Sequence, residues 1–135
     1  MRRLGLIIII LSLLSSCHTE HAKGYLTFSG TLENTKDSTL TILGDGLTKV
    51  IKISDNGTFK DTLKVPEASL FNIYTSSNKR GIVFLKNGYH IKLTSNSTNF
   101  FSSFKYEGND EGADSNNFFV SRYNFGQSSG NIKGF

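Results

Sequence analysis

Residues able to carry out covalent chemistry are scarce in this sequence. Its 135 residues include one cysteine, Cys17, and three histidines. A single cysteine forms neither an internal disulfide nor a Cys-x-x-Cys redox pair, and with only three histidines the usual structural zinc sites lack ligands. The sequence therefore excludes disulfide scaffolds, zinc ribbons and self-contained dithiol enzymes, and it implies no cofactor.

One motif has the spacing of a catalytic nucleophile. Residues 126–130, Gly-Gln-Ser-Ser-Gly, match the G-x-S-x-G elbow of α/β-hydrolases. That elbow needs a buried strand before it, a helix after it and a later histidine as base, and no histidine follows Ser128. His90 lies beside Lys92 on the polar side of an expected strand, with no acidic residue close in sequence. We interpret the motif as a chance match and His90 as a surface residue.

Carboxylates are the remaining candidates for acid–base or metal chemistry. Most lie in expected turns or in an acidic loop: Asp45, Asp55, Asp61, Glu107, Asp110, Glu111 and Asp114. The last three, with Asn109, could offer oxygen ligands to calcium, but their spacing is not that of an EF-hand. His18, Glu20 and His21 lie in an expected flexible tether, where nothing orients metal ligands. The sequence thus predicts neither a metal site nor an enzyme.

The cysteine follows a segment typical of a secretory signal. Met1-Arg2-Arg3 precedes 11 residues, 4–14, that are nearly all apolar; a membrane span needs ~20. Residues 14–17, Leu-Ser-Ser-Cys, resemble the lipobox of bacterial lipoproteins, whose cysteine is lipidated after cleavage. The resemblance implies a signal peptide over 1–16, a diacylglycerol and an N-acyl chain such as palmitate on Cys17, and an anchor facing the periplasm. The residue after the cysteine is His18, and not the aspartate that favours retention in the inner membrane in some bacteria. This position therefore favours the outer membrane. The alternative is an uncleaved hydrophobic anchor.

The net charge of the mature chain argues against a nucleic-acid-binding protein. The sequence has 15 basic and 11 acidic side chains. Cleavage before Cys17 would remove Arg2 and Arg3 and leave 13 basic side chains against 11 acidic ones. A nearly neutral domain lacks the basic patch that nucleic-acid binding requires.

From residue 25 the hydropathy pattern predicts an all-β domain. Leu26, Phe28 and Leu32 alternate with polar residues, as in a strand with one buried face. Further β-rich runs follow between turn clusters, at 40–43, 47–53, 59–65, 70–75, 81–86, 89–94 and 103–107. Asn56-Gly57 and Asn87-Gly88 predict tight hairpins. About eight short strands predict an antiparallel β-sandwich or a barrel-like sheet.

The domain map follows from these patterns. We expect a lipidated tether over 17–24, the sandwich over 25–109, a loop and short helix over 110–125, and a flexible tail over 126–135. Asp114-Ser115 can cap the helix, on which Phe118, Phe119, Arg122 and Tyr123 share a face. In the pairs Phe100-Phe101 and Phe118-Phe119, either one ring lies on a contact surface or both belong to a two-sided core.

Several short motifs together resemble a known domain. They are Phe28-Ser29-Gly30-Thr31-Leu32, Asp55-Asn56-Gly57-Thr58-Phe59, Phe84-Leu85-Lys86-Asn87-Gly88, Ile91-Lys92-Leu93 and Tyr106-Glu107-Gly108. Over residues 24–123 the chain resembles the β-rich N-terminal domain of unknown function of membrane-anchored, TlpA-like thiol-disulfide oxidoreductases of Gram-negative bacteria. In that family a following thioredoxin domain with a W-C-x-x-C motif does the chemistry. This sequence has no tryptophan and no second cysteine, so no redox residue is carried over.

Three functional hypotheses follow. The first is an accessory lipoprotein, anchored to membrane lipid through Cys17, whose non-catalytic sandwich docks a protein partner in the periplasm. The second is an N-terminal fragment of a thiol-disulfide oxidoreductase whose thioredoxin domain is missing. The third is a sandwich that binds carbohydrate or peptide.

Overall fold

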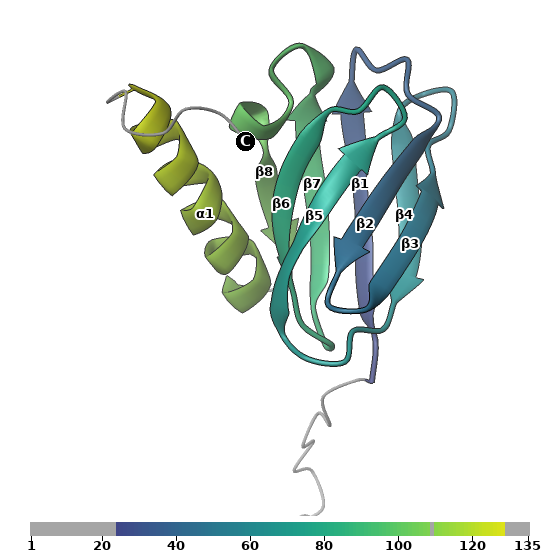
Figure 1. The fold of residues 1–135 in the computed structure, drawn as a ribbon, viewed down its shortest axis with the longest axis vertical. Helices are drawn as coiled ribbons and strands as arrows, with labels where there is room; N and C mark the ends of the chain where they lie inside the picture. The colour runs from purple at the N-terminus through teal and green to yellow at the C-terminus, as the bar shows by residue number, and fades with distance from the viewer. Residues whose placement is uncertain (1–23, 109, 129–135) are drawn as a thin grey trace, which may run out of the picture.

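The computed structural model describes residues 24–108 and 110–128, which fold into two packed β-sheets and one helix (Figure 1). The predicted all-β sandwich of eight strands with a C-terminal helix is confirmed. Sheet A has the spatial order β4 (Thr58–Leu63), β1 (Leu26–Glu33), β7 (His90–Asn96), β8 (Lys105–Gly108). Sheet B has the order β3 (Leu47–Lys52), β2 (Thr39–Gly44), β5 (Ser69–Thr75), β6 (Arg80–Leu85).

The chain passes repeatedly between the two sheets. It starts with β1 in sheet A, forms β2 and β3 in sheet B, returns for β4, forms β5 and β6 in sheet B, and ends with β7 and β8 in sheet A. The paired strands are antiparallel except β1 and β7, which run parallel with Gly30 opposite Leu93. Since β7 enters sheet A from the same end as β1, the two central strands share a direction.

The two Asn-Gly turns do not close hairpins, and this part of the prediction is wrong. Asn56-Gly57 connects β3 in sheet B to β4 in sheet A, and Asn87-Gly88 connects β6 in sheet B to β7 in sheet A. Gly57 and Gly88 have φ angles of +82° and +97°, so the backbone reverses as expected. The turn residues set the reversal of direction, but they do not determine which strand becomes the neighbour.

The core lies between the inner faces of the sheets. Along β1 buried and half-exposed residues alternate, with Leu26, Phe28 and Leu32 buried as predicted. At Gly30 a Cβ would collide with the carbonyl oxygen of Leu93 and lie 2.8 Å from the ring of Phe59. That ring packs edge-on against Phe28, with centroids 5.2 Å apart. A glycine at the centre of β1 therefore makes room for the aromatic packing of sheet A.

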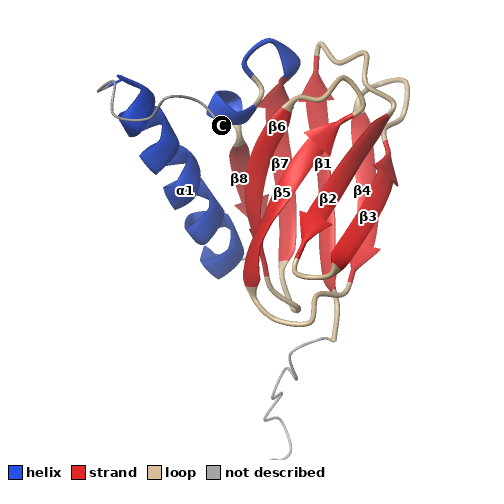
Figure 2. Ribbon diagram, viewed as in Figure 1, coloured by secondary structure: helices blue, strands red, loops and turns tan. Residues whose placement is uncertain are grey.

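Helix α1 (Asp110–Ser128) lies along one side of the sandwich, next to β8 and β6 (Figure 2). It is longer than predicted, beginning before Asp114-Ser115 and extending through Gly126. Its buried positions include Gly112, Ala113, Asn116 and Val120. On the face expected from the aromatic residues, Phe119 and Tyr123 are half-buried, whereas Phe118 and Arg122 are exposed. Glycine has a low helix propensity and alanine adds little hydrophobicity, although both permit close packing. The first turn of α1 therefore lacks the hydrophobic pattern by which a helix is predicted. No helix in the described part of the chain is long and apolar enough to span a membrane.

Two adjacent asparagines join α1 to the edges of both sheets. The side chain of Asn116 accepts a hydrogen bond from the amide of Phe84 in β6 (2.7 Å) and donates one to its carbonyl (2.9 Å). Asn117 bonds the amide (2.8 Å) and the carbonyl (2.9 Å) of Tyr106 in β8 in the same way. The helix thus satisfies backbone groups that an edge strand would otherwise leave unpaired.

Candidate functional site

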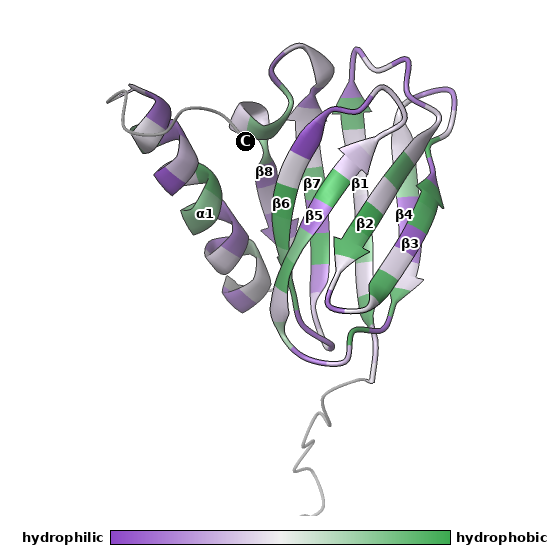
Figure 3. Cartoon of the chain, in the orientation of Figure 1, coloured by the Kyte–Doolittle hydropathy of each residue, from purple (hydrophilic) through white to green (hydrophobic). Residues whose placement is uncertain are grey.

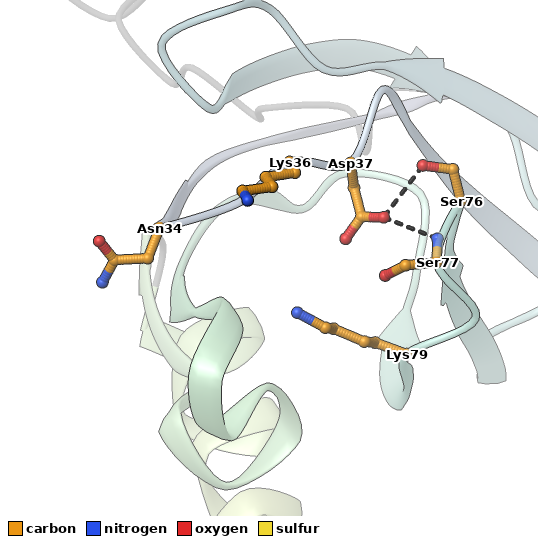
Figure 4. A pocket seen from close by; sticks show the side chains of 6 residues that line it. All are labelled: Asn34, Lys36, Asp37, Ser76, Ser77 and Lys79. Atoms are coloured by element: carbon orange, nitrogen blue, oxygen red, sulfur yellow. Dashed lines mark hydrogen bonds between the residues drawn. The ribbon is translucent and has the colours of Figure 1, made fainter.

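A polar hollow of about 430 Å³ opens at the end of the sandwich where β1 ends (Figure 4). It is lined by Asn34, Lys36, Asp37, Ser76, Ser77 and Lys79. The first three belong to the β1–β2 loop and the last three to the β5–β6 turn. Loops at one end of a sandwich are held by a rigid scaffold, which suits them to binding.

Side-chain hydrogen bonds connect the loops around the hollow. Asp37 Oδ1 accepts bonds from the Ser77 amide (2.6 Å) and the Ser76 hydroxyl (3.0 Å), which joins the β1–β2 loop to the β5–β6 turn. Lys79 Nζ donates to the carbonyl (2.7 Å) and the hydroxyl (2.9 Å) of Ser97. A longer contact, 3.4 Å, joins the Asn34 amide to Asn96 at the end of β7. Three separate segments are therefore fixed relative to one another.

Asp37 is the buried charge of this network, with only 9% of its surface exposed. Burial raises the pKa of its carboxyl, but hydrogen bonds from the Ser77 side chain and backbone, and from Ser76 and Thr75, together lower that pKa below its ordinary value. The carboxylate stays ionised at neutral pH, with Oδ1 occupied by two donors and Oδ2 3.4 Å from the Thr35 hydroxyl. This environment suits a structural anion and is unsuited to a general acid or base.

The two lysines supply the positive charge of the hollow. Lys79 uses two of its three N–H donors on Ser97, so one donor remains. The ammonium group of Lys36 is exposed and has no hydrogen bond or ion pair with any residue among 24–108 and 110–128. In Figure 4 the side chain of Lys79 extends into the space between the β1–β2 loop and the β5–β6 turn. The arrangement is able to bind an anionic group.

The local sequence gives no sign of this site. Residues 34–38 have the composition of a turn, and Lys79-Arg80 has that of a solvated loop tip. Lys79 is instead half-buried, and Arg80 lies over the ring of Tyr74, 5.6 Å from its centroid. The burial of Asp37 depends on a turn 40 residues away in sequence, which no local pattern reveals.

The residues considered for catalysis lie apart. Ser128 is the last residue of α1, where its hydroxyl donates to the Phe125 carbonyl at 2.9 Å, so the elbow geometry is absent there. His90 is exposed at the start of β7, facing outward from sheet A. Both residues occupy a context unlike the one that their candidate chemistry requires.

The candidate carboxylates are also dispersed. Asp45 and Asp55 lie in turns, and Asp61 in β4 pairs with Lys49 of β3 at 3.5 Å. Glu107 belongs to β8, and Glu111 and Asp114 lie on α1, so the expected acidic loop is largely strand and helix. Glu111 bonds Lys86 at 3.1 Å and raises the pKa of that ammonium. Over residues 24–108 and 110–128 no three His, Cys, Asp or Glu side chains cluster as metal ligands.

Of the two adjacent aromatic pairs, one belongs wholly to the core and the other places one ring on the surface. Phe100 and Phe101 are both buried and stack edge-on against Phe104, with centroids 4.9 and 5.1 Å away. Phe119 packs near Phe84, while Phe118 is 59% exposed. Cys17, with His18, Glu20 and His21, lies outside the described residues.

A second surface is the outer face of sheet B. Strand alternation directs twelve side chains outward: Thr39, Thr41, Leu43, Thr48, Val50, Lys52, Leu70, Asn72, Tyr74, Arg80, Ile82 and Phe84. Leu43, Val50 and Leu70 are 41%, 57% and 45% exposed. Lys52 and Arg80 are its only formal charges, both positive. Hydrophobic segments recur along these strands in Figure 3.

Comparisons of the chain with protein-family models, with curated proteins and with solved structures found no match.

Proposed function

We propose that this protein is an accessory lipoprotein of the bacterial cell envelope, anchored through Cys17, whose non-catalytic sandwich docks a protein partner in the periplasm. The observation that supports docking is the outer face of sheet B, which combines exposed Leu43, Val50 and Leu70 with no acidic residue. In the strand register Leu43 lies diagonally across from both Val50 and Leu70. Exposed apolar residues that gather on one face of a folded domain are typical of interaction sites.

The charges of this face favour a partner with acidic groups. Lys52 and Arg80 lie on the outer face of sheet B, at the β3 edge and at the start of β6. A surface that packs on the apolar centre and carries acidic groups opposite these two cations matches this face. A second copy of the same face would bring like charges together, so we propose a different protein with an apolar, acid-flanked contact surface.

The docking face is tested by position-specific photo-crosslinking in cells. A photoreactive residue at Val50 or Leu70 should give the same discrete adduct, whereas one at Thr31 or Thr94, on the outer face of sheet A, should not. Arg80→Glu should weaken the adduct because it puts an acidic group opposite the partner's acidic groups. Equal adducts from both sheets, or an adduct unchanged by Arg80→Glu, would contradict the docking proposal.

The anchor is tested independently. Cys17→Ala should leave an unprocessed precursor that incorporates no labelled palmitate, because the acceptor thiol is absent. Cys17→Ser tests the same thiol with a closer isostere, and Ser16→Ala, which keeps a small residue before Cys17, should be processed normally. Normal cleavage and membrane association of the alanine variant would show that Cys17 is not the attachment point.

A further inference from the structure

We propose that the hollow between the β1–β2 loop and the β5–β6 turn is a binding site for an oxyanion group, a carboxylate or a phosphate, held between Lys36 and Lys79. This site is separate from the outer face of sheet B. The proposal therefore stands whether or not that face docks a protein.

Most of the hollow is preorganised. Asp37 fixes the β1–β2 loop to the β5–β6 turn through Ser76 and Ser77, and Lys79 fixes that turn to Ser97. Because these bonds already hold the two loops and the Lys79 side chain, a ligand would have to order only the exposed Lys36 side chain, and ordering is one of the main costs of binding.

The charges and hydrogen-bond donors of the hollow favour an anionic ligand. Among the lining residues two are cationic and one, Asp37, is anionic. Asp37 Oδ1 is occupied by two protein donors, and Oδ2 has a longer contact, 3.4 Å, from the Thr35 hydroxyl. One N–H of Lys79 and all three of Lys36 remain for a ligand, since none bonds a described residue. Charge-assisted bonds from ammonium groups to carboxylate or phosphate are among the strongest in proteins.

The hollow is larger than a single oxyanion group. About 430 Å³ is more space than one carboxylate or phosphate fills, and it lies within the usual range for small-molecule pockets, ~300–1,000 Å³. The remaining lining is polar, with the hydroxyls of Ser76 and Ser77 and the amide of Asn34. The anionic group would accordingly be one end of a larger, hydrophilic molecule.

The test is an NMR titration of the chain from His18 to Phe135, which contains the whole core from Leu26 to Val120. Acetate and inorganic phosphate are added in parallel at constant ionic strength, with chloride as the reference anion. We expect saturable shifts of the amides of residues 34–38 and 76–79. The ratio of the two dissociation constants then assigns the group to the carboxylate or the phosphate class.

Variants locate the site. Lys36→Met should weaken binding about tenfold, the loss expected for one charge-assisted bond. Lys79→Met should do the same; Lys36 is exposed, so its variant stays informative if Lys79→Met unfolds. Lys64→Met, the same change in the β4–β5 loop at the opposite end, should leave affinity unchanged. Shifts that do not saturate, that chloride reproduces, or that persist unaltered in Lys36→Met would overturn the proposal.

Discussion

Replacing Asn116 by leucine tests the hydrogen bonds that join α1 to β6 of sheet B, called here the α1–β6 joint. Asn116 is 1% exposed, and its amide bonds the N–H and the carbonyl of Phe84 and also the Gly112 carbonyl, the last at 2.9 Å. Leucine has the branching of asparagine and no polar atom, but its methyl groups are larger than the amide atoms that they replace. The substitution therefore removes three hydrogen bonds, and crowding by the methyl groups adds to the cost of those lost bonds.

The cost of the lost bonds is set by the backbone groups left without partners. The amide and carbonyl of Phe84 would face an apolar side chain, and an unsatisfied buried group costs ~1–3 kcal/mol. Phe84 is half-buried, so we take the lower part of that range for each group. The sum, about 2–3 kcal/mol, corresponds to a fall in Tm of roughly 10 °C for a domain of this size.

Urea unfolding of the chain from His18, followed by circular dichroism, measures this free energy, and hydrogen exchange of the Phe84 amide reports the joint locally. The matched control is Asn124→Leu, which removes one bond, 3.0 Å, from the half-buried Asn124 side chain to the carbonyl of the exposed Ser102. We expect that control to change stability by less than about 0.5 kcal/mol. If Asn116→Leu lies within the same margin and Phe84 exchanges no faster, the joint does not stabilise the fold.

A second substitution at this position tests the assignment of donor and acceptor. Asn116→Asp keeps an acceptor for the Phe84 amide but sets a carboxylate against the carbonyls of Phe84 and Gly112. Burial and this repulsion should raise the pKa of the new carboxyl in the folded state. The penalty should therefore be present at neutral pH and diminish as the pH falls through that raised pKa. A variant whose penalty does not change with pH would contradict the assignment.

Three further predictions concern contacts elsewhere in the domain. Gly30→Ala should destabilise by at least ~2 kcal/mol, since its Cβ would meet the Leu93 carbonyl on a central strand; unfolding no easier than wild type would refute this. The pKa of Asp37 is lowered in the folded state. Its contribution to the free energy of unfolding is therefore present above the pKa of the unfolded state, ~3.9, and is lost as the pH falls through the pKa of the folded state. Asp37→Asn should remove that acid dependence, and an unchanged profile would exclude this origin. Asn87→Ala should cost about 1–2 kcal/mol by releasing both backbone groups of Val65, bonded at 3.0 and 2.8 Å; normal exchange of the Val65 amide would contradict that.

The sequence predicted strands well because burial on one face leaves a period of two. β1 shows this most clearly, since its buried and half-exposed positions follow the apolar pattern from Leu26 to Leu32. Which strands belong to which of the two sheets could not be predicted in the same way. Inner faces of both sheets are equally apolar, so Asn56-Gly57 and Asn87-Gly88 read as hairpins although each joins strands of different sheets.

The polar contacts that organise the molecule escaped prediction for a related reason. Three asparagines each bond the N–H and the carbonyl of one distant residue, as a neighbouring strand would: Asn87 with Val65, Asn116 with Phe84 and Asn117 with Tyr106. Asparagine is common in turns and helix starts, so its local context gives no sign of such a role. The same holds for Asp37 and Lys79, whose partners are 40 and 18 residues away.

The direction of β1 relates the proposed anchor to the proposed oxyanion site. β1 begins at the end of the sandwich that follows the tether and ends at the hollow, and its eight residues span about 26 Å at ~3.3 Å per residue (Figure 1). Residues 18–24 reach at most ~24 Å when fully extended, so a lipid on Cys17 would keep the domain close to the membrane. The hollow would then open at the end farthest from the point of attachment, accessible to solutes of the periplasm. The outer face of sheet B would lie along the side of the domain, where a partner can approach without displacing the anchor.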